Sequence, residues 1–157
     1  MIAGMFRNLL SRLFSDDPQP KPLASEDAEV ALAALLVRVA RSDDHYSDVE
    51  RRRIDRVLSR RRGLSGDEAA NRRAAAEMIE AEAPDTVRFT RLIKDRIALE
   101  DRQGVITAMW EVAYADGRRN AEEESLIRLV AGLLGISDLD SGLARQRVIE
   151  KLGQSDA

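Results

Sequence analysis

The sequence VARSD at residues 39–43 has a counterpart, VAYAD at residues 112–116, when the chain is laid over itself at an offset of 73 residues. Seven residues after the aspartate of each copy comes a glutamate, Glu50 in the first and Glu123 in the second. Each copy therefore predicts a helix that ends near an aspartate, a short loop, and a second helix that starts just before the glutamate. Such a doublet indicates two pseudo-repeats whose equivalent helices pack across each other.

Helical spacing of apolar residues extends outward from this doublet over most of the chain. Three polar residues fit the start of a capping box, each with a glutamate three positions later: Ser47, Ser65 and Asn120. No window alternates apolar and polar residues over the length of a strand. The sequence predicts an all-α fold, a compact bundle of about seven helices over residues 25–152, followed by a short tail at residues 153–157.

The residues of the doublet resemble the signature of the TerB-like family, which is named after the tellurite-resistance protein TerB. The plainer copy reads AYADG-x5-E-x3-I from Ala113, and the weaker copy has Asp44 in place of the glycine. The resemblance covers about residues 25–152. It implies a compact all-α fold and an association with bacterial stress responses to tellurite and related oxyanions or metals. It implies no enzymatic activity, and we expect a cytoplasmic module, in some settings peripheral to the inner membrane, that binds partner proteins.

The composition excludes several classes of site. The chain has no cysteine, which rules out disulfides, thiolate metal sites and a cysteine nucleophile. His45 is the only histidine, so a His-rich zinc site is ruled out as well. The sequence contains no phosphate-binding loop, nucleophile elbow or dinucleotide fingerprint. We therefore expect that the protein is not an enzyme and requires no cofactor.

Acidic residues gather in the two loops of the doublet. Asp43 and Glu50 belong to the first loop and the helix after it, and Asp116 and Glu123 take the same positions in the second. If the repeats pack symmetrically, these carboxylates come together, and oxygen ligands of this kind suit a divalent cation such as Ca²⁺ or Mg²⁺. A structural role explains the same residues, because both glutamates stand where capping boxes need them and both aspartates can accept bonds from turn amides. The sequence leaves both interpretations open.

Arginine is concentrated in residues 51–62, where seven of the twelve positions carry it and Asp55 is the only acid. Such a patch can contact phosphates. However, no aromatic residue is interleaved to stack on bases, and the whole chain carries a net charge of −3. We therefore do not expect nucleic-acid binding, and we interpret the patch as solvated or as facing a protein partner.

Residues 1–15 predict an amphipathic helix that is separate from the bundle, because residues 16–24 contain three prolines and read as a tether. This helix can dock on the bundle, pair with a partner protein, or lie on a membrane surface through residues 1–14. The third fate makes a peripheral membrane adaptor the alternative function. The apolar residues available for the contact include Ile2, Met5, Phe6, Leu9 and Leu13.

Removal of residues 1–22 should leave the melting temperature of the remaining domain nearly unchanged, because a tethered helix adds nothing to the packing of the core. Differential scanning calorimetry of the full and truncated chains measures this. Co-sedimentation of both chains with anionic vesicles then separates membrane contact from pairing with a protein. A large loss of stability on truncation would show that the helix belongs to the core.

Overall fold

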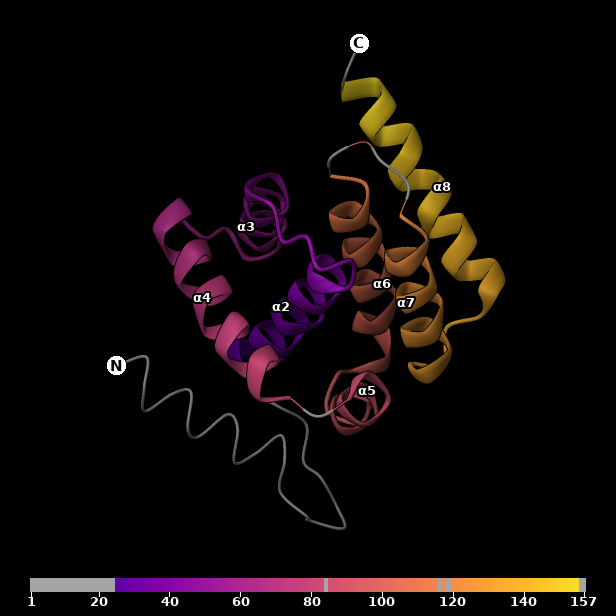
Figure 1. The fold of residues 1–157 in the computed structure, drawn as a ribbon, viewed down its shortest axis with the longest axis horizontal. Coiled ribbons are helices and arrows are strands. Elements are labelled where there is room, and N and C mark those ends of the chain that lie inside the picture. The colour runs from indigo at the N-terminus through magenta and orange to yellow at the C-terminus, as the bar shows by residue number, and fades with distance from the viewer. Residues whose placement is uncertain (1–24, 84, 116, 118–119, 156–157) are drawn as a thin grey trace.

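The computed structural model describes residues 25–83, 85–115, 117 and 120–155. This part of the chain folds into seven helices and contains no strand (Figure 1), which confirms the predicted fold class. Residues 1–15 and 16–24, expected to form the amphipathic helix and the tether, lie outside the described residues. The helices are α2 (Ser25–Arg41), α3 (Asp48–Arg62), α4 (Gly66–Glu82), α5 (Thr86–Lys94), α6 (Leu99–Ala113), α7 (Ala121–Leu133) and α8 (Asp138–Ser155).

Helix α2 lies at the centre of the bundle, with α3 and α4 on one side and α6 and α7 on the other (Figure 1). Residues 29–37 are all buried, so the middle of this helix has no exposed face. Alanines let the neighbouring helices approach its backbone closely: Ala31, Ala33, Ala34 and Ala40 are buried. A helix that is enclosed on all sides holds the core together, and helices from both halves of the chain share that core.

The order of the helices follows the sequence repeat. The offset of 73 residues places the first residue of α3, Asp48, on the first residue of α7, Ala121, and places α2 over α6. Helices α2 and α6 pack directly on each other. Helices α3 and α4 pack on α2, and α7 and α8 pack on α6, while α5 connects the two halves and contacts α7. The equivalent first helices therefore meet at the centre, as the doublet predicts.

The loop after the first helix of each repeat turns at a residue with a left-handed backbone. Asp44 has a φ of 62°, and Gly117, its counterpart at the repeat offset, has a φ of 74°. Aspartate is one of the few residues other than glycine that adopts this conformation at moderate cost. The weaker copy of the signature therefore keeps the turn even though it lacks the glycine.

Capping residues mark the helix starts where the sequence places them. Ser47 and Ser65 form complete capping boxes with Glu50 and Glu68, so the first amides of α3 and α4 have acceptors. Gly63, with a φ of 64°, ends α3. These local signals bound α3 without help from distant parts of the chain.

Gly63→Ala should lower the free energy of unfolding by about 1 kcal/mol, because an L-residue in the left-handed region is strained. The methyl group itself meets no atom within 4 Å, so a steric clash would not explain the loss. Gly66→Ala is the matched control, since its added methyl group is equally free of contacts and its φ is not in that region. Urea unfolding of the two variants measures the difference, and equal losses would contradict the backbone explanation.

Candidate functional site

The loop between α2 and α3 meets the start of α7. The Oδ2 atom of Asp43 accepts a hydrogen bond of 3.1 Å from Nδ2 of Asn120, and its Oδ1 atom accepts one of 2.9 Å from the backbone N–H of His45. Asn120 is the N-cap of α7, and its Oδ1 atom accepts from the N–H of Glu123 at 3.0 Å. The acidic loop of the first repeat is therefore bonded to the helix start of the second.

Two buried carboxyl groups lie side by side where these loops meet. Glu50 and Glu123 are each only 4% exposed, and their carboxyl groups are close enough to hydrogen-bond when one of them carries a proton. The Oε1 atom of Glu50 accepts from the N–H and the hydroxyl of Ser47, at 3.2 and 3.1 Å. Its Oε2 atom is buried and receives no hydrogen bond from a protein donor. Of the two carboxyl oxygens of Glu50, one is therefore occupied by the cap, and the other receives no hydrogen bond.

Burial dominates the electrostatics of this pair. It raises the pKa of Glu50 above the usual range, and the Asp43 carboxylate adds to the rise. Hydrogen bonds from Ser47 and the contact with Glu123 oppose the rise without cancelling it. The charged form of Glu50 is therefore less favourable in this site than it is in water.

The capping box predicted for α7 is only half formed. Asn120 accepts from the N–H of Glu123, but in the described contacts the Glu123 carboxyl group does not return to the Asn120 amide as Glu50 returns to Ser47. Instead it lies beside Glu50. The structure therefore confirms the predicted cap at Asn120, in the half of the box that its own side chain makes.

The structure places three of the four predicted cation ligands in one region: Asp43, Glu50 and Glu123. Asp116, the fourth, lies outside the described residues, as do the apolar contact residues predicted in the first helix: Ile2, Met5, Phe6, Leu9 and Leu13. Within the described ranges, no group of three or more acidic or histidine side chains has the geometry to hold a metal ion. The carboxyl pair is thus not a complete set of metal ligands in the described part of the chain.

Comparison with known proteins agrees with the doublet. The family model for tellurite resistance protein TerB matches residues 29–146, which include both acidic loops, most of α2, all helices from α3 to α7 and the first half of α8. The chain belongs to the TerB family. No curated protein and no solved structure matches this TerB-family chain.

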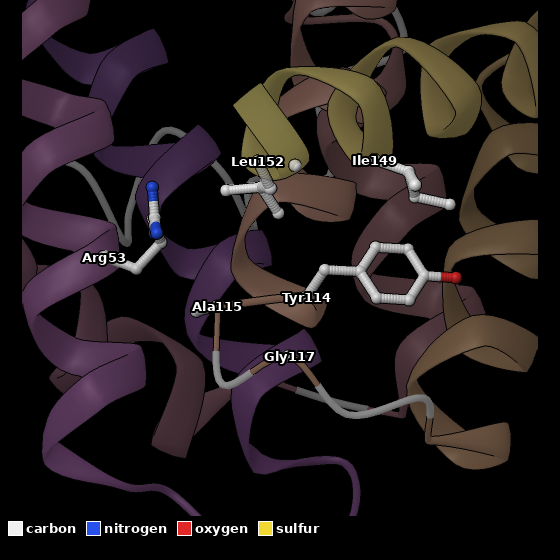
Figure 2. Close-up of a pocket in the computed structure, with 7 residues that line it drawn as sticks. Arg53, Tyr114, Ala115, Gly117, Ile149 and Leu152 are labelled. Atoms are coloured by element: carbon white, nitrogen blue, oxygen red, sulfur yellow. The ribbon is translucent and has the colours of Figure 1, made fainter. Parts of the chain in front are cut away.

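A pocket of about 220 Å³ opens beside the end of α6. Figure 2 shows Arg53 of α3 on one side of it, Ile149 and Leu152 of α8 on another, and Tyr114 below them. The Tyr114 hydroxyl donates to Oε2 of Glu124 at 3.0 Å and accepts from Nε of Arg145 at 2.7 Å. Burial raises the pKa of Tyr114, so the hydroxyl stays protonated and serves to hold α8 on α6 and α7.

Sequence reasoning missed the partners that reach across the chain. Asn120 was expected only as a cap, and its side chain also ties Asp43 to the second repeat. Glu124 and Arg145 were not singled out, and together with Tyr114 they join three helices. Trp110 is buried and stacks on Tyr114 with ring centroids 5.8 Å apart.

No helix in the described part of this TerB-family chain has the length and hydrophobicity to cross a membrane.

Glu50→Gln should leave the free energy of unfolding at pH 7 unchanged or raise it by up to about 1 kcal/mol in metal-free buffer, because it removes a buried charge and keeps an acceptor for Ser47. The folded pKa of Glu50 is raised, so the native chain binds more protons than the unfolded one between that pKa and the usual value of 4.5. The wild type should therefore gain stability relative to Glu50→Gln as the pH falls from 7 towards 5. Urea unfolding across this range tests it, and a parallel pH dependence of the two chains would contradict it.

Glu29→Gln is the contrasting variant and should cost about 2–3 kcal/mol at pH 7, because Glu29 is buried and bonded to Arg61 at 3.1 Å and to Arg62 at 3.2 Å. Burial alone would raise the pKa of Glu29, but the two arginines hold it below the usual value of 4.5. Its contribution is therefore present above pH 4.5 and is lost as the pH falls through the folded pKa. Equal pH profiles for the Glu29 and Glu50 variants would contradict this assignment.

Proposed function

We propose that this TerB-family chain is a non-catalytic helical module of a bacterial stress system related to tellurite and metals, which binds partner proteins and takes a divalent cation, Ca²⁺ or Mg²⁺, between its acidic loops. The observation that carries the cation proposal is the buried Oε2 atom of Glu50, which receives no hydrogen bond in a carboxyl group that interacts with the Glu123 carboxyl group of the other repeat.

A cation resolves two unfavourable features of this pair at once. A buried acceptor without a donor costs about 1–3 kcal/mol, and two neighbouring carboxylates cannot both ionise cheaply. Ca²⁺ and Mg²⁺ bind oxygen ligands and supply the missing positive charge. Asp43 adds a third carboxylate to the electrostatics of the region, and Asp116 has the same place in the second repeat of the sequence. Water and backbone carbonyl groups would supply the remaining ligands.

The lack of a catalytic role is supported by what lines the pocket beside the acidic loops. Its described lining contains neither histidine nor serine, and the one hydroxyl there, that of Tyr114, is already bonded to Glu124 and Arg145. A nucleophile with an adjacent base is therefore missing from that lining. The pocket suits contact with a partner better than chemistry on a substrate.

The membrane-adaptor alternative depends on residues 1–14, which lie outside the described residues. It is independent of the cation proposal, because the acidic loops belong to the bundle. Vesicle co-sedimentation of the full and truncated chains tests it separately.

Addition of millimolar Ca²⁺ or Mg²⁺ to the metal-free protein should raise its melting temperature, because a ligand that binds only the native state stabilises it by mass action, by about 2.7 kcal/mol at a hundred times Kd. Glu123→Gln should abolish the shift while leaving the circular dichroism spectrum unchanged. Glu68→Gln is the matched control, since Glu68 is the third residue of α4 as Glu123 is of α7 but is exposed, and it should keep the full shift. Absence of a shift in the wild type, or a full shift in Glu123→Gln, would contradict the cation proposal.

A further inference from the structure

The outer face of α3 carries three exposed arginines in one row. Arg52, Arg56 and Arg60 stand four residues apart, so their side chains follow one another along the same side of the helix. Like charges at this spacing destabilise a helix by a small amount. The repulsion between members of the row therefore does not stabilise α3.

The other arginines of α3 are engaged in the structure, whereas two members of the row lack an acidic partner. Arg61 and Arg62 are bonded to the buried Glu29, and Arg60 is paired with Glu111 of α6. Arg52 donates only to the backbone carbonyl of Asp48, at 3.3 Å. Arg56 makes no hydrogen bond or ion pair with any described residue. Two guanidinium groups in line with a third are thus available to an external anion.

A groove of about 320 Å³ lies between α3 and α6, and Arg60, the last member of this row, lines it. Val57, Gly104 and Ala108 give it an apolar lining of small and medium side chains. A methyl group on Gly104 would lie 3.1 Å from Nη1 of Arg61. Because Gly104 has no side chain, the Arg61 guanidinium group can lie against α6 while it is bonded to Glu29. The groove can therefore accept an aliphatic side chain next to the row of charges.

We propose that this face of α3 docks an acidic helical segment of a partner protein. Carboxylates four residues apart on such a segment match the spacing of Arg52, Arg56 and Arg60, and arginine forks bind carboxylates in a bidentate manner. An aliphatic side chain of the segment enters the groove against Val57. The proposal names the partner chemistry for the protein-binding part of the proposed function and rests on that part alone.

A nucleic acid fits this face less well. The row contains no aromatic side chain on which bases could stack, and the carboxylate of Glu111 lies in the groove, where it repels phosphate. The net charge of −3 on the whole chain opposes a polyanion as well. An acidic peptide needs no aromatic side chain to stack on. It also carries fewer negative charges than a nucleic acid, so Glu111 and the net charge of the chain repel it less, and its aliphatic side chain adds an apolar contact.

Fluorescence anisotropy of a labelled twelve-residue helical peptide, with glutamate at every fourth position and leucine beside it, tests the proposal in metal-free buffer at low salt. The full chain should bind it saturably. The double variant Arg52→Gln/Arg56→Gln should weaken binding about tenfold. The control Arg88→Gln/Arg91→Gln removes two exposed arginines of α5 and the same charge, and should bind within about twofold of the wild type. A peptide with serine in place of leucine should bind more weakly than the parent.

No saturable binding of the leucine peptide below millimolar concentration would overturn the proposal, and so would equal losses in the two double variants. Displacement of the peptide by a twelve-nucleotide thymidine oligomer at lower concentration than by unlabelled peptide would assign the face to nucleic acid and overturn it too. The metal-dependent thermal shift is measured on the same wild-type chain without peptide. A failure of peptide binding would therefore not affect the test of the cation proposal.

Discussion

Helix α2 has almost no solvent-exposed surface in its middle part, and the arrangement of the other helices follows from that constraint. Every residue from 29 to 37 is buried, so α3, α4, α6 and α7 must all find room around one helix. Alanine at several of its positions makes this packing close enough to exclude water. Because α2 and α6 pack on each other, the loops that follow them leave the core at neighbouring points. The contact between Asp43 and Asn120 is a direct consequence.

Two buried glutamates of the bundle, Glu29 and Glu50, lie in opposite electrostatic environments. Glu29 is matched by two arginines from the end of α3, which keeps it ionised and joins α2 to α3. Glu50 instead has acidic neighbours, Glu123 and Asp43, and a buried oxygen without a donor. That contrast is the physical basis for assigning Glu50 and Glu123 to ligand binding and Glu29 to the stability of the fold.

Signals of short range in the sequence predicted the fold well. The repeat predicted the order of the helices, and the caps at Ser47 and Ser65 predicted where α3 and α4 start. The position of Asp44 opposite Gly117 shows that even the imperfect copy of the signature encodes the same left-handed turn. The candidate site was predicted only in part, because its decisive features depend on which side chains meet across the repeats. Glu123 satisfies the local pattern of a capping box, yet its carboxyl group lies beside Glu50, and nothing within α7 specifies that choice.

The most direct test of the central claim observes the carboxyl pair itself during a metal titration. Carbon-13 NMR of the glutamate side-chain carboxyl groups, assigned by the Glu50→Gln and Glu123→Gln variants, follows both resonances as Ca²⁺ or Mg²⁺ is added. The account predicts that the Glu50 and Glu123 signals move together and saturate at one cation per chain, while the exposed Glu68 signal does not follow them. Movement of neither signal, or uniform small changes across all glutamates, would contradict the claim that the two repeats share a cation site.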